Sequence, residues 1–223
     1  MKRLRLLASA ASLVVLSLGS GVHAANLVTN GSFEADPFTG SGVGYLLGLN
    51  GNAVTGWFIP ASDGVYPWGL QNVNTFSGGP AADGNQWLVL GEFNSGVEYT
   101  IQQTLTGLSP GASYKLRFAI ASERDCCSTA EVSFLNGSAT AAQNFTAPNS
   151  GSFWTQWGYN NLVFVASANS VTFQFKNVNL SSSGIDLGLD DVSVTGVVPE
   201  PSTGALLGLG LAGLGLVGRR RAV

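Results

Sequence analysis

Hydrophobic and polar residues alternate along the second half of the chain with a period of two. The stretches that show this alternation are 99–106, 114–120, 132–134, 162–164, 171–176 and 189–195. Such a pattern predicts β-strands with one buried face. Gly- and Pro-containing segments between them, such as Leu108–Gly111 and Asn136-Gly137, predict turns. No stretch of the interior shows a helical period, so we expect an all-β fold, an antiparallel two-sheet sandwich or jelly roll.

The first 24 residues have the layout of a secretory signal peptide. Basic residues near the N-terminus precede an apolar run over residues 6–18, and Val22 to Ala24 form a small-x-small cleavage pattern. The apolar run is too short for a permanent transmembrane helix. We therefore expect a signal helix over residues 1–24 and a mature chain that begins at Ala25.

The last 25 residues have three parts. They are Pro199-Glu200-Pro201, the uncharged run 202–218, and Arg219-Arg220-Arg221. As a helix, the uncharged run would reach about 25 Å, which approaches the thickness of a bilayer core. The arginines would hold its far end in the cytoplasm. We therefore expect a hydrophobic helix within residues 199–223 that anchors the chain in the inner membrane, with the folded body outside.

This tail resembles the PEP-CTERM sorting signal, which consists of a Pro-Glu-Pro motif, a Gly/Leu/Ala-rich helix and a basic cluster. The resemblance implies that an exosortase-type membrane enzyme cuts the chain near Pro199-Glu200-Pro201. It also implies that the protein is exported and reaches the cell surface or the matrix of a bacterium that makes exopolysaccharide. A plain C-terminal membrane anchor is the alternative.

The body between the two ends, residues 25–198, has the length of one domain. It contains four Lys and Arg against twelve Asp and Glu, a net charge of −8. Such an acidic body argues against nucleic-acid binding, which requires a basic surface. The single histidine, His23, lies in the signal peptide, so the mature chain lacks a histidine for a catalytic triad or for a zinc site.

Four motifs of the body resemble, in their order, those of the galactose-binding-like jelly rolls, which include many carbohydrate-binding modules. They are the segment 26–34 (NLVTNGSFE), Gly56-Trp57, the segment 111–118 (GASYKLRF) and the segment 189–194 (LDDVSV). The resemblance implies a two-sheet jelly roll whose first and last strands lie close together. It also implies a role in binding polysaccharide.

The same resemblance implies a structural Ca²⁺ that ties the N-terminal segment to the last strand. Val192 should face inward, which would place Asp190 on the same side, where a buried carboxylate needs a partner or a metal. We expect Asp190 and Glu34 to be ligands, with backbone oxygens near Asn30 and Ser32 completing the shell. Alternatively, the two acids accept hydrogen bonds from loops and bind no metal.

Aromatic residues in turn-rich stretches are candidates for stacking against sugars. The candidate ligand-binding residues are Tyr66, Trp68, Gln71, Trp154, Trp157 and Tyr159. We expect Trp57 to lie in the core instead, and Trp87 is an equally good core candidate. The alternative is that all of these aromatic residues pack inside the sandwich.

Cys126 and Cys127 are adjacent in a polar loop between two expected strands. Export favours a bond between cysteines. A disulfide between neighbours closes a strained ring, so three states remain open. These are a disulfide between Cys126 and Cys127, a bridge to another chain, and two free thiols.

Taken together, the sequence predicts an exported surface or matrix protein without enzymatic activity, whose β-sandwich binds polysaccharide weakly. A purely structural or adhesive matrix protein is the alternative. A glycan-acting enzyme is the third option, because a glycosidase needs two carboxylates at a suitable separation. Its candidate acids would be Glu92, Glu98, Glu123 and Asp125, around which no catalytic motif occurs.

Overall fold

The computed structural model describes most of the body and little of the two ends. The described residues are 25–37, 51–60, 68–73, 79–91, 99–123, 128–148, 151, 153–178, 186–197 and 210. The expected signal helix, Tyr66, Cys126-Cys127, the Pro-Glu-Pro motif and the terminal arginines all lie outside these residues. The described part of the chain contains no apolar helix of a length that could span a bilayer.

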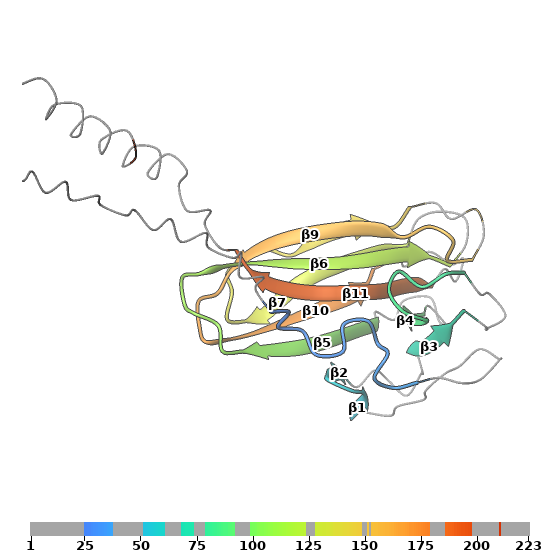
Figure 1. Ribbon diagram of the computed structural model, residues 1–223, viewed down its shortest axis with the longest axis horizontal. Coiled ribbons are helices and arrows are strands. Elements are labelled where there is room, and N and C mark those ends of the chain that lie inside the picture. Colours follow the sequence, from blue (N-terminus) through green and yellow to red (C-terminus); the bar gives the residue numbers. More distant parts are fainter. Residues whose placement is uncertain are drawn as a thin grey trace, which may run out of the picture.

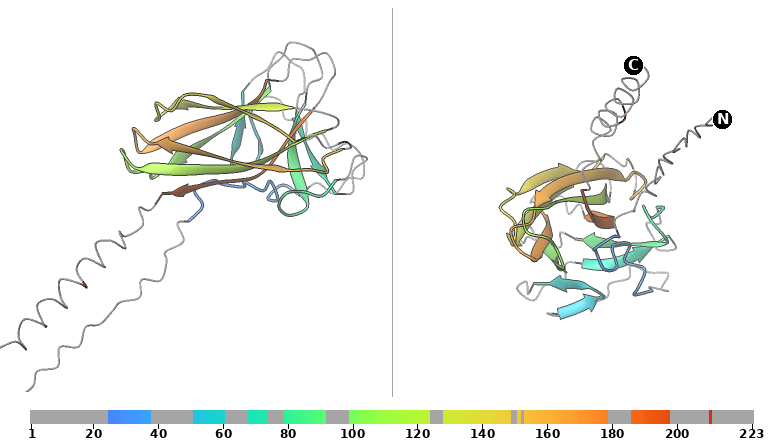
Figure 2. Two further views of the ribbon diagram at one scale, coloured as in Figure 1. Left: turned by 90° about the horizontal axis from the view of Figure 1, so that it is seen from above. Right: turned by 60° about the vertical axis from the view of Figure 1, so that its left-hand side comes forward.

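The described residues form two antiparallel sheets that face each other (Figures 1 and 2). One sheet has the order β1 (Gly51–Val54), β2 (Trp57–Ile59), β5 (Tyr99–Thr106), β10 (Ser170–Asn177), β7 (Thr129–Asn136) and β8 (Gln143–Thr146). The other has the order β3 (Trp68–Asn72), β4 (Gln86–Leu90), β11 (Leu187–Gly196), β6 (Ser113–Ser122) and β9 (Gly158–Val165). This arrangement confirms the all-β jelly-roll prediction, including the strands expected from alternation.

The main core fills the space between the two sheets. Its largest members are fully buried aromatic rings, and Trp57 packs edge-on against Phe173 at a centroid distance of 5.8 Å. Phe118 and Phe175 are also edge-on, at 4.9 Å. Aromatic pairs in this geometry add stability beyond the area that they bury. The placement of Trp57 confirms that it is a core residue.

A second, smaller core covers the opposite face of the five-stranded sheet. Along β4, Leu88 and Leu90 belong to the main core, whereas Trp87 and Val89 belong to the second cluster. Since neighbouring residues of a strand point to opposite faces, this cluster lies on the outer face of its sheet. Trp154 completes it, with its ring centroid 6.2 Å from that of Trp87. The sheet is therefore buried on both sides near the start of β11.

The N-terminal segment lies beside β11, but it is not a strand. Leu27 N donates to Val194 O at 2.9 Å, and Val192 N donates to Gly31 O at 2.9 Å. The first and last segments of the body therefore lie close together, as expected, although the first is not a strand. Asn30 and Phe33 adopt positive φ angles, which break the extended backbone that a regular strand requires.

One expectation about β11 was wrong. Asp190 pairs with Ala119 of β6 and follows Leu189 of the main core, so its side chain lies on the outer face of the sheet. The register between β11 and β6 shifts after Asp190, where Asp191 has a φ of 46°. This bulge changes which face the following residues point to, and Val192 returns to the main core.

Candidate functional site

A row of outward-facing polar residues and one aromatic residue crosses four strands of the six-stranded sheet. Phe58 of β2 pairs with Gln102 of β5, Gln102 pairs with Gln174 of β10, and Gln174 pairs with Ser133 of β7. Neighbouring residues such as Ile101 point into the core, which leaves this row on the solvent side. We call these four residues the amide face.

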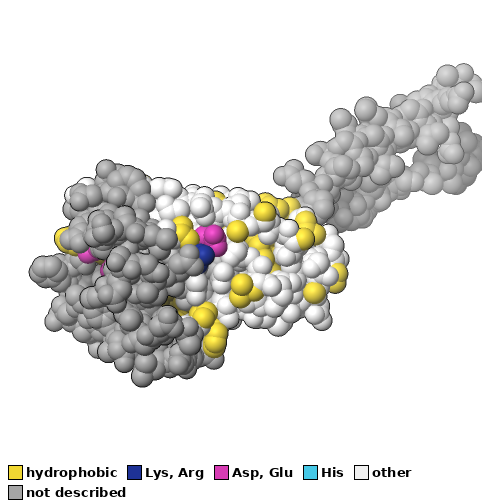
Figure 3. Space-filling view, turned by 180° about the vertical axis from the view of Figure 1, so that it is seen from behind, with side chains coloured by type: hydrophobic (Ala, Val, Ile, Leu, Met, Phe, Trp, Pro, Cys, Tyr) yellow, Lys and Arg dark blue, Asp and Glu magenta, His cyan; other side chains and the backbone are white. Residues whose placement is uncertain are grey.

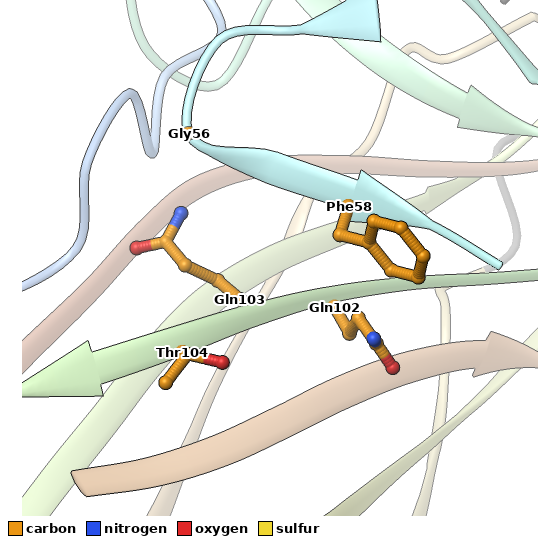
Figure 4. Close-up of a pocket in the computed structure, with 5 residues that line it drawn as sticks. All are labelled: Gly56, Phe58, Gln102, Gln103 and Thr104. Atoms are coloured by element: carbon orange, nitrogen blue, oxygen red, sulfur yellow. The ribbon is translucent and has the colours of Figure 1, made fainter. Parts of the chain in front are cut away.

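A hollow lies at the β2 end of the amide face (Figure 4). Its volume is about 460 Å³, within the range of ligand sites in proteins. Its lining residues are Gly56, Phe58, Gln102, Gln103 and Thr104. Phe58 remains 44% exposed, which is unusual for a large aromatic side chain of a sheet. The hollow therefore offers an aromatic ring next to amide and hydroxyl groups.

Two neighbouring glutamines of β5 have different roles. Gln103 is buried, and its amide makes two hydrogen bonds to the backbone of Thr29, at 2.8 Å and 2.9 Å. It therefore fixes the N-terminal segment to the sheet. Gln102 is half-buried and makes no side-chain hydrogen bond within the described part of the chain. In Figure 4 it lies beside the Phe58 ring, while Gln103 points away.

The surroundings of the amide face are polar but carry little charge. The hydroxyls of Thr104 and Thr172 lie 2.8 Å apart, and the Gln174 amide donates to the Ser133 hydroxyl at 2.9 Å. The charged pair on this face is Lys176 with Glu131, at 3.5 Å, and the two charges compensate each other. Figure 3 shows that described charged side chains are also scarce on the side of the molecule turned away from Figure 1.

The two acids expected to bind calcium hold the loop before β4 through hydrogen bonds. Both backbone N–H groups of Ala82 and Asp83 donate to Asp190 Oδ2, at 2.8 Å and 2.9 Å. The N–H groups of Asn85 and Gln86 donate to Glu34 Oε1, at 2.7 Å and 2.8 Å. The loop is thus joined to β11 at one end and to the N-terminal segment at the other.

The other two residues assigned to the calcium shell lie in the N-terminal segment. The Asn30 amide donates to Asp36 Oδ2 at 3.1 Å and to Thr55 O at 3.1 Å, and Asn30 Oδ1 accepts from Ala35 N at 3.0 Å. Ser32 is half-buried. Among the described residues, no three His, Cys, Asp or Glu side chains gather in a metal-binding group. Backbone N–H groups donate to both oxygens of Asp190 and to Oε1 of Glu34. Calcium binding by these acids stays a prediction.

Asp190 is fully buried, and this burial raises the pKa of its carboxyl to about 8. Hydrogen bonds from the backbone of Asp83, Asp191 and Ala82 act in the opposite direction, because they favour the ionised form. Burial also raises the pKa of Asp191, while the nearby Arg117 guanidinium lowers it. Arg117 and Asp191 form an ion pair at 2.9 Å.

The structure gathers the described residues that the sequence suggested for glycan binding around Trp87 and the loop before β4, and it buries most of them. Trp154 is fully buried against Trp87, so this residue corrects our expectation of an exposed ring. Gln71 is also buried. Trp157 is half-buried, and its indole N–H donates to Pro80 O at 2.7 Å. Trp68 lies in β3, but its side chain is outside the described part of the structure, as is Tyr66.

Tyr159 is the described member of this set with the most exposed ring, at 52%. It lies on the outer face of β9, and the Arg117 guanidinium sits 5.0 Å from its ring centre. This cation–π contact covers part of the ring. Among the members of the set whose side chains the structure describes, Tyr159 is thus the exposed aromatic residue, and it lies on the five-stranded sheet, away from the amide face.

Family comparisons account for both the body and the tail. Residues 26–189 match the family described as "Protein of unknown function (DUF642)". The chain belongs to the DUF642 family. Residues 197–221 of this DUF642 protein match the PEP-CTERM protein-sorting motif, which confirms the resemblance of its tail. The motif indicates that the protein is exported and sorted to the cell surface. No curated protein matches the sequence significantly.

Solved structures resemble the body of this DUF642 protein at low sequence identity. The enzymatically active domain of bacteriophage CBA120 tailspike protein 4 is 16% identical, with a TM-score of 0.52 over 77% of this chain. An arabinose-bound α-L-arabinofuranosidase, MgGH51, is 13% identical, with a TM-score of 0.50 over 82% of this chain. The chain spans only 21% and 28% of these two proteins, respectively. The similarity shows the shared fold.

A carbohydrate-binding module, TmCBM61 in complex with β-1,4-galactotriose, is similar over nearly its whole length. It is 13% identical, and the match covers 77% of this chain and 99% of the module, with a TM-score of 0.46.

Sequence reasoning missed the amide face because its four members are far apart along the chain. Alternation placed Gln102 and Gln174 on the polar side of their strands, but it did not show that they are neighbours. Phe58 follows the buried Trp57 directly, so it had to point outward. That local signal could have identified Phe58 as an exposed ring.

Proposed function

We propose that the mature protein is a non-enzymatic, surface-sorted protein that binds a neutral polysaccharide through the amide face. The observation that carries this proposal is the exposed Phe58 ring beside the Gln102 amide, at the mouth of a hollow of about 460 Å³. Among the described residues, the Gln102 side chain has no hydrogen-bond partner. The fold alone does not identify a ligand, since one fold hosts many functions. The ligand class is therefore inferred from the side chains of the amide face.

The chemistry of the amide face suits an uncharged sugar chain. The Phe58 ring can stack against the apolar C–H face of a sugar. Gln102 offers both a donor and an acceptor, which matches the hydroxyls of a sugar ring. Thr104 adds a hydroxyl further along β5, and Ser133 adds one across the strands on β7. An acidic glycan would instead favour free basic side chains, whereas Lys176 is paired with Glu131 here.

A chain of sugars could lie across the strands. The four members of the amide face belong to four adjacent strands, so the row spans three strand spacings, about 14 Å. Each added sugar would then meet a further amide or hydroxyl. Exposed, separate contacts of this kind give weak affinity, and many copies on a surface would raise it through avidity.

Two further parts of the proposal concern the ends of the body. Before processing, the hydrophobic run 202–218 anchors the chain in the inner membrane, and an exosortase-type enzyme removes it. Ca²⁺ binding by Glu34 and Asp190 would strengthen the junction between the N-terminal segment, the loop before β4 and β11. This part of the proposal is supported by the hydrogen bonds that Asp190 and Glu34 accept from that loop, because they already join the three segments.

Binding can be tested by affinity electrophoresis of residues 25–198 in gels that contain neutral or acidic polysaccharides. We expect retardation by a neutral glycan, and a loss of retardation in Phe58→Ala and in Gln102→Ala. Tyr159→Ala is the matched control, because it removes an exposed ring from the other sheet. Equal retardation of all variants would overturn the amide face as the site. No retardation of the wild type by any glycan would favour the purely structural or adhesive role.

A further inference from the structure

Both ends of the body leave the sandwich at the same place. Val194 N donates to Asn26 Oδ1 at 2.9 Å, which puts the first mature residues beside the last residues of β11. Figures 1 and 2 show the N-terminal segment and the end of β11 together at one end of the sheets. The Pro-Glu-Pro motif begins two residues after Val197. The first described residues of the body and the last residues of β11 are therefore neighbours in space.

Exposed valines gather at this exit point. Val163, Val165 and Val197 are 54%, 48% and 45% exposed. Ser113 of β6 lies between two of these valines. It pairs with Val165 of β9 on one side, and on the β11 side its carbonyl oxygen accepts from Val197 N at 2.9 Å. Val163 pairs with Lys115, which is exposed on the same outer face. We call Val163, Val165, Val197 and Lys115 the exit patch.

The length of the tether places the exit patch near the membrane. Five residue steps separate Val197 from Ser202, where the apolar run begins, so they are at most about 18 Å apart. The headgroup layer on one side of a bilayer takes about 5–8 Å of that distance. Val165 lies two strands from Val197, about 10 Å away. The whole patch is therefore within reach of the headgroups while the tail spans the bilayer.

We propose that the exit patch rests on the outer headgroup surface of the membrane until the tail is cut. This proposal depends on the membrane anchoring proposed above. The valines suit the boundary between headgroups and acyl chains, and Lys115 suits the lipid phosphates. The contact is small, but the tether gives it a high effective concentration, so weak affinity is sufficient. The contact would hold the Pro-Glu-Pro motif at a fixed depth for the processing enzyme.

Lysine footprinting on vesicles tests this docking. The chain from Ala25 to Val223 is incorporated into phosphatidylcholine vesicles with and without phosphatidylglycerol, and flotation reports whether the tail anchors it. Acetylation of Lys115 is then measured by mass spectrometry, with Lys176 on the other sheet as the internal reference. If the patch is docked for about four-fifths of the time, Lys115 should be acetylated about fivefold more slowly than in the tail-free body, residues 25–198.

Variants separate docking from anchoring. The double variant Val163→Ser, Val165→Ser should still float but should lose the protection of Lys115. Leu135→Ser is the matched control, because Leu135 is 52% exposed on the other sheet, and it should keep the protection. A floating chain whose Lys115 reacts as fast as in the tail-free body would overturn the docking alone.

Two other outcomes also contradict the proposal. A chain that does not float would overturn the anchoring, and the docking with it. Protection of Lys115 that appears without vesicles and grows with protein concentration would assign the exit patch to a second copy of this chain. β9 is the edge strand of its sheet, which makes such pairing the relevant competitor.

Discussion

Asp190→Asn tests the role of the buried carboxylate that joins the loop before β4 to β11. The pKa of Asp190 is raised from 3.8 to about 8 in the folded protein. Between these pH values the folded protein holds one proton more than the unfolded chain, so stability falls as pH rises through this window. At 1.36 kcal/mol per pKa unit, the loss amounts to about 6 kcal/mol at most between pH 4 and pH 8.

The asparagine variant should remove this pH dependence. Its amide oxygen can still accept from Ala82 and Asp83, but its NH₂ group would face the N–H of Asp191, which now donates to Asp190 Oδ1. We therefore expect the variant to be less stable by about 1–3 kcal/mol at pH 5, where one hydrogen bond is lost. Above pH 8 it should be more stable than the wild type, because it buries no charge.

Urea unfolding followed by tryptophan fluorescence at several pH values measures both effects. The measurements need EDTA, so that metal binding does not contribute. We expect the wild-type midpoint to fall from pH 5 to pH 8 and the variant midpoint to change little. A wild-type midpoint that is constant or rises over this range would refute the reasoning. It would mean that the three backbone N–H donors outweigh burial and keep Asp190 ionised.

Three further predictions concern stability. If Ca²⁺ binds the ionised Asp190, adding Ca²⁺ at pH 8 should raise the melting temperature of the wild type but not that of Asp190→Asn. Calorimetry measures both temperatures, and equal rises would contradict the metal site. Trp154→Ala should cost about 3–5 kcal/mol, because it empties the second core, and a loss below about 1 kcal/mol in urea unfolding would contradict the burial of its ring. Gly31→Ala should cost about 1–3 kcal/mol, because its Cβ would lie 1.9 Å from Val192 O; an unchanged midpoint would contradict the contact between the N-terminal segment and β11.

The sorting motif could be identified from the sequence because all of its parts lie in one continuous segment of the chain. The Pro-Glu-Pro motif, the uncharged run and the arginines follow one another in a single segment that matches the sorting motif, so no distant residue was needed to identify them. Strands were predictable for a similar local reason. Val171, Phe173 and Phe175 alternate with polar residues because the two faces of a strand meet different environments.

The binding face and the buried acid were decided by tertiary structure. Phe58, Gln102 and Gln174 become neighbours only through the register of β2, β5 and β10, which long-range pairing sets. The position of Asp190 depends on the bulge at Asp191, a single residue with positive φ that the period-two pattern does not reveal. The sequence by itself predicted which residues face the core in regularly alternating strands such as β10. Which of those residues meet depends on hydrogen bonds between strands that are distant in the chain, and local periodicity carries no information about them.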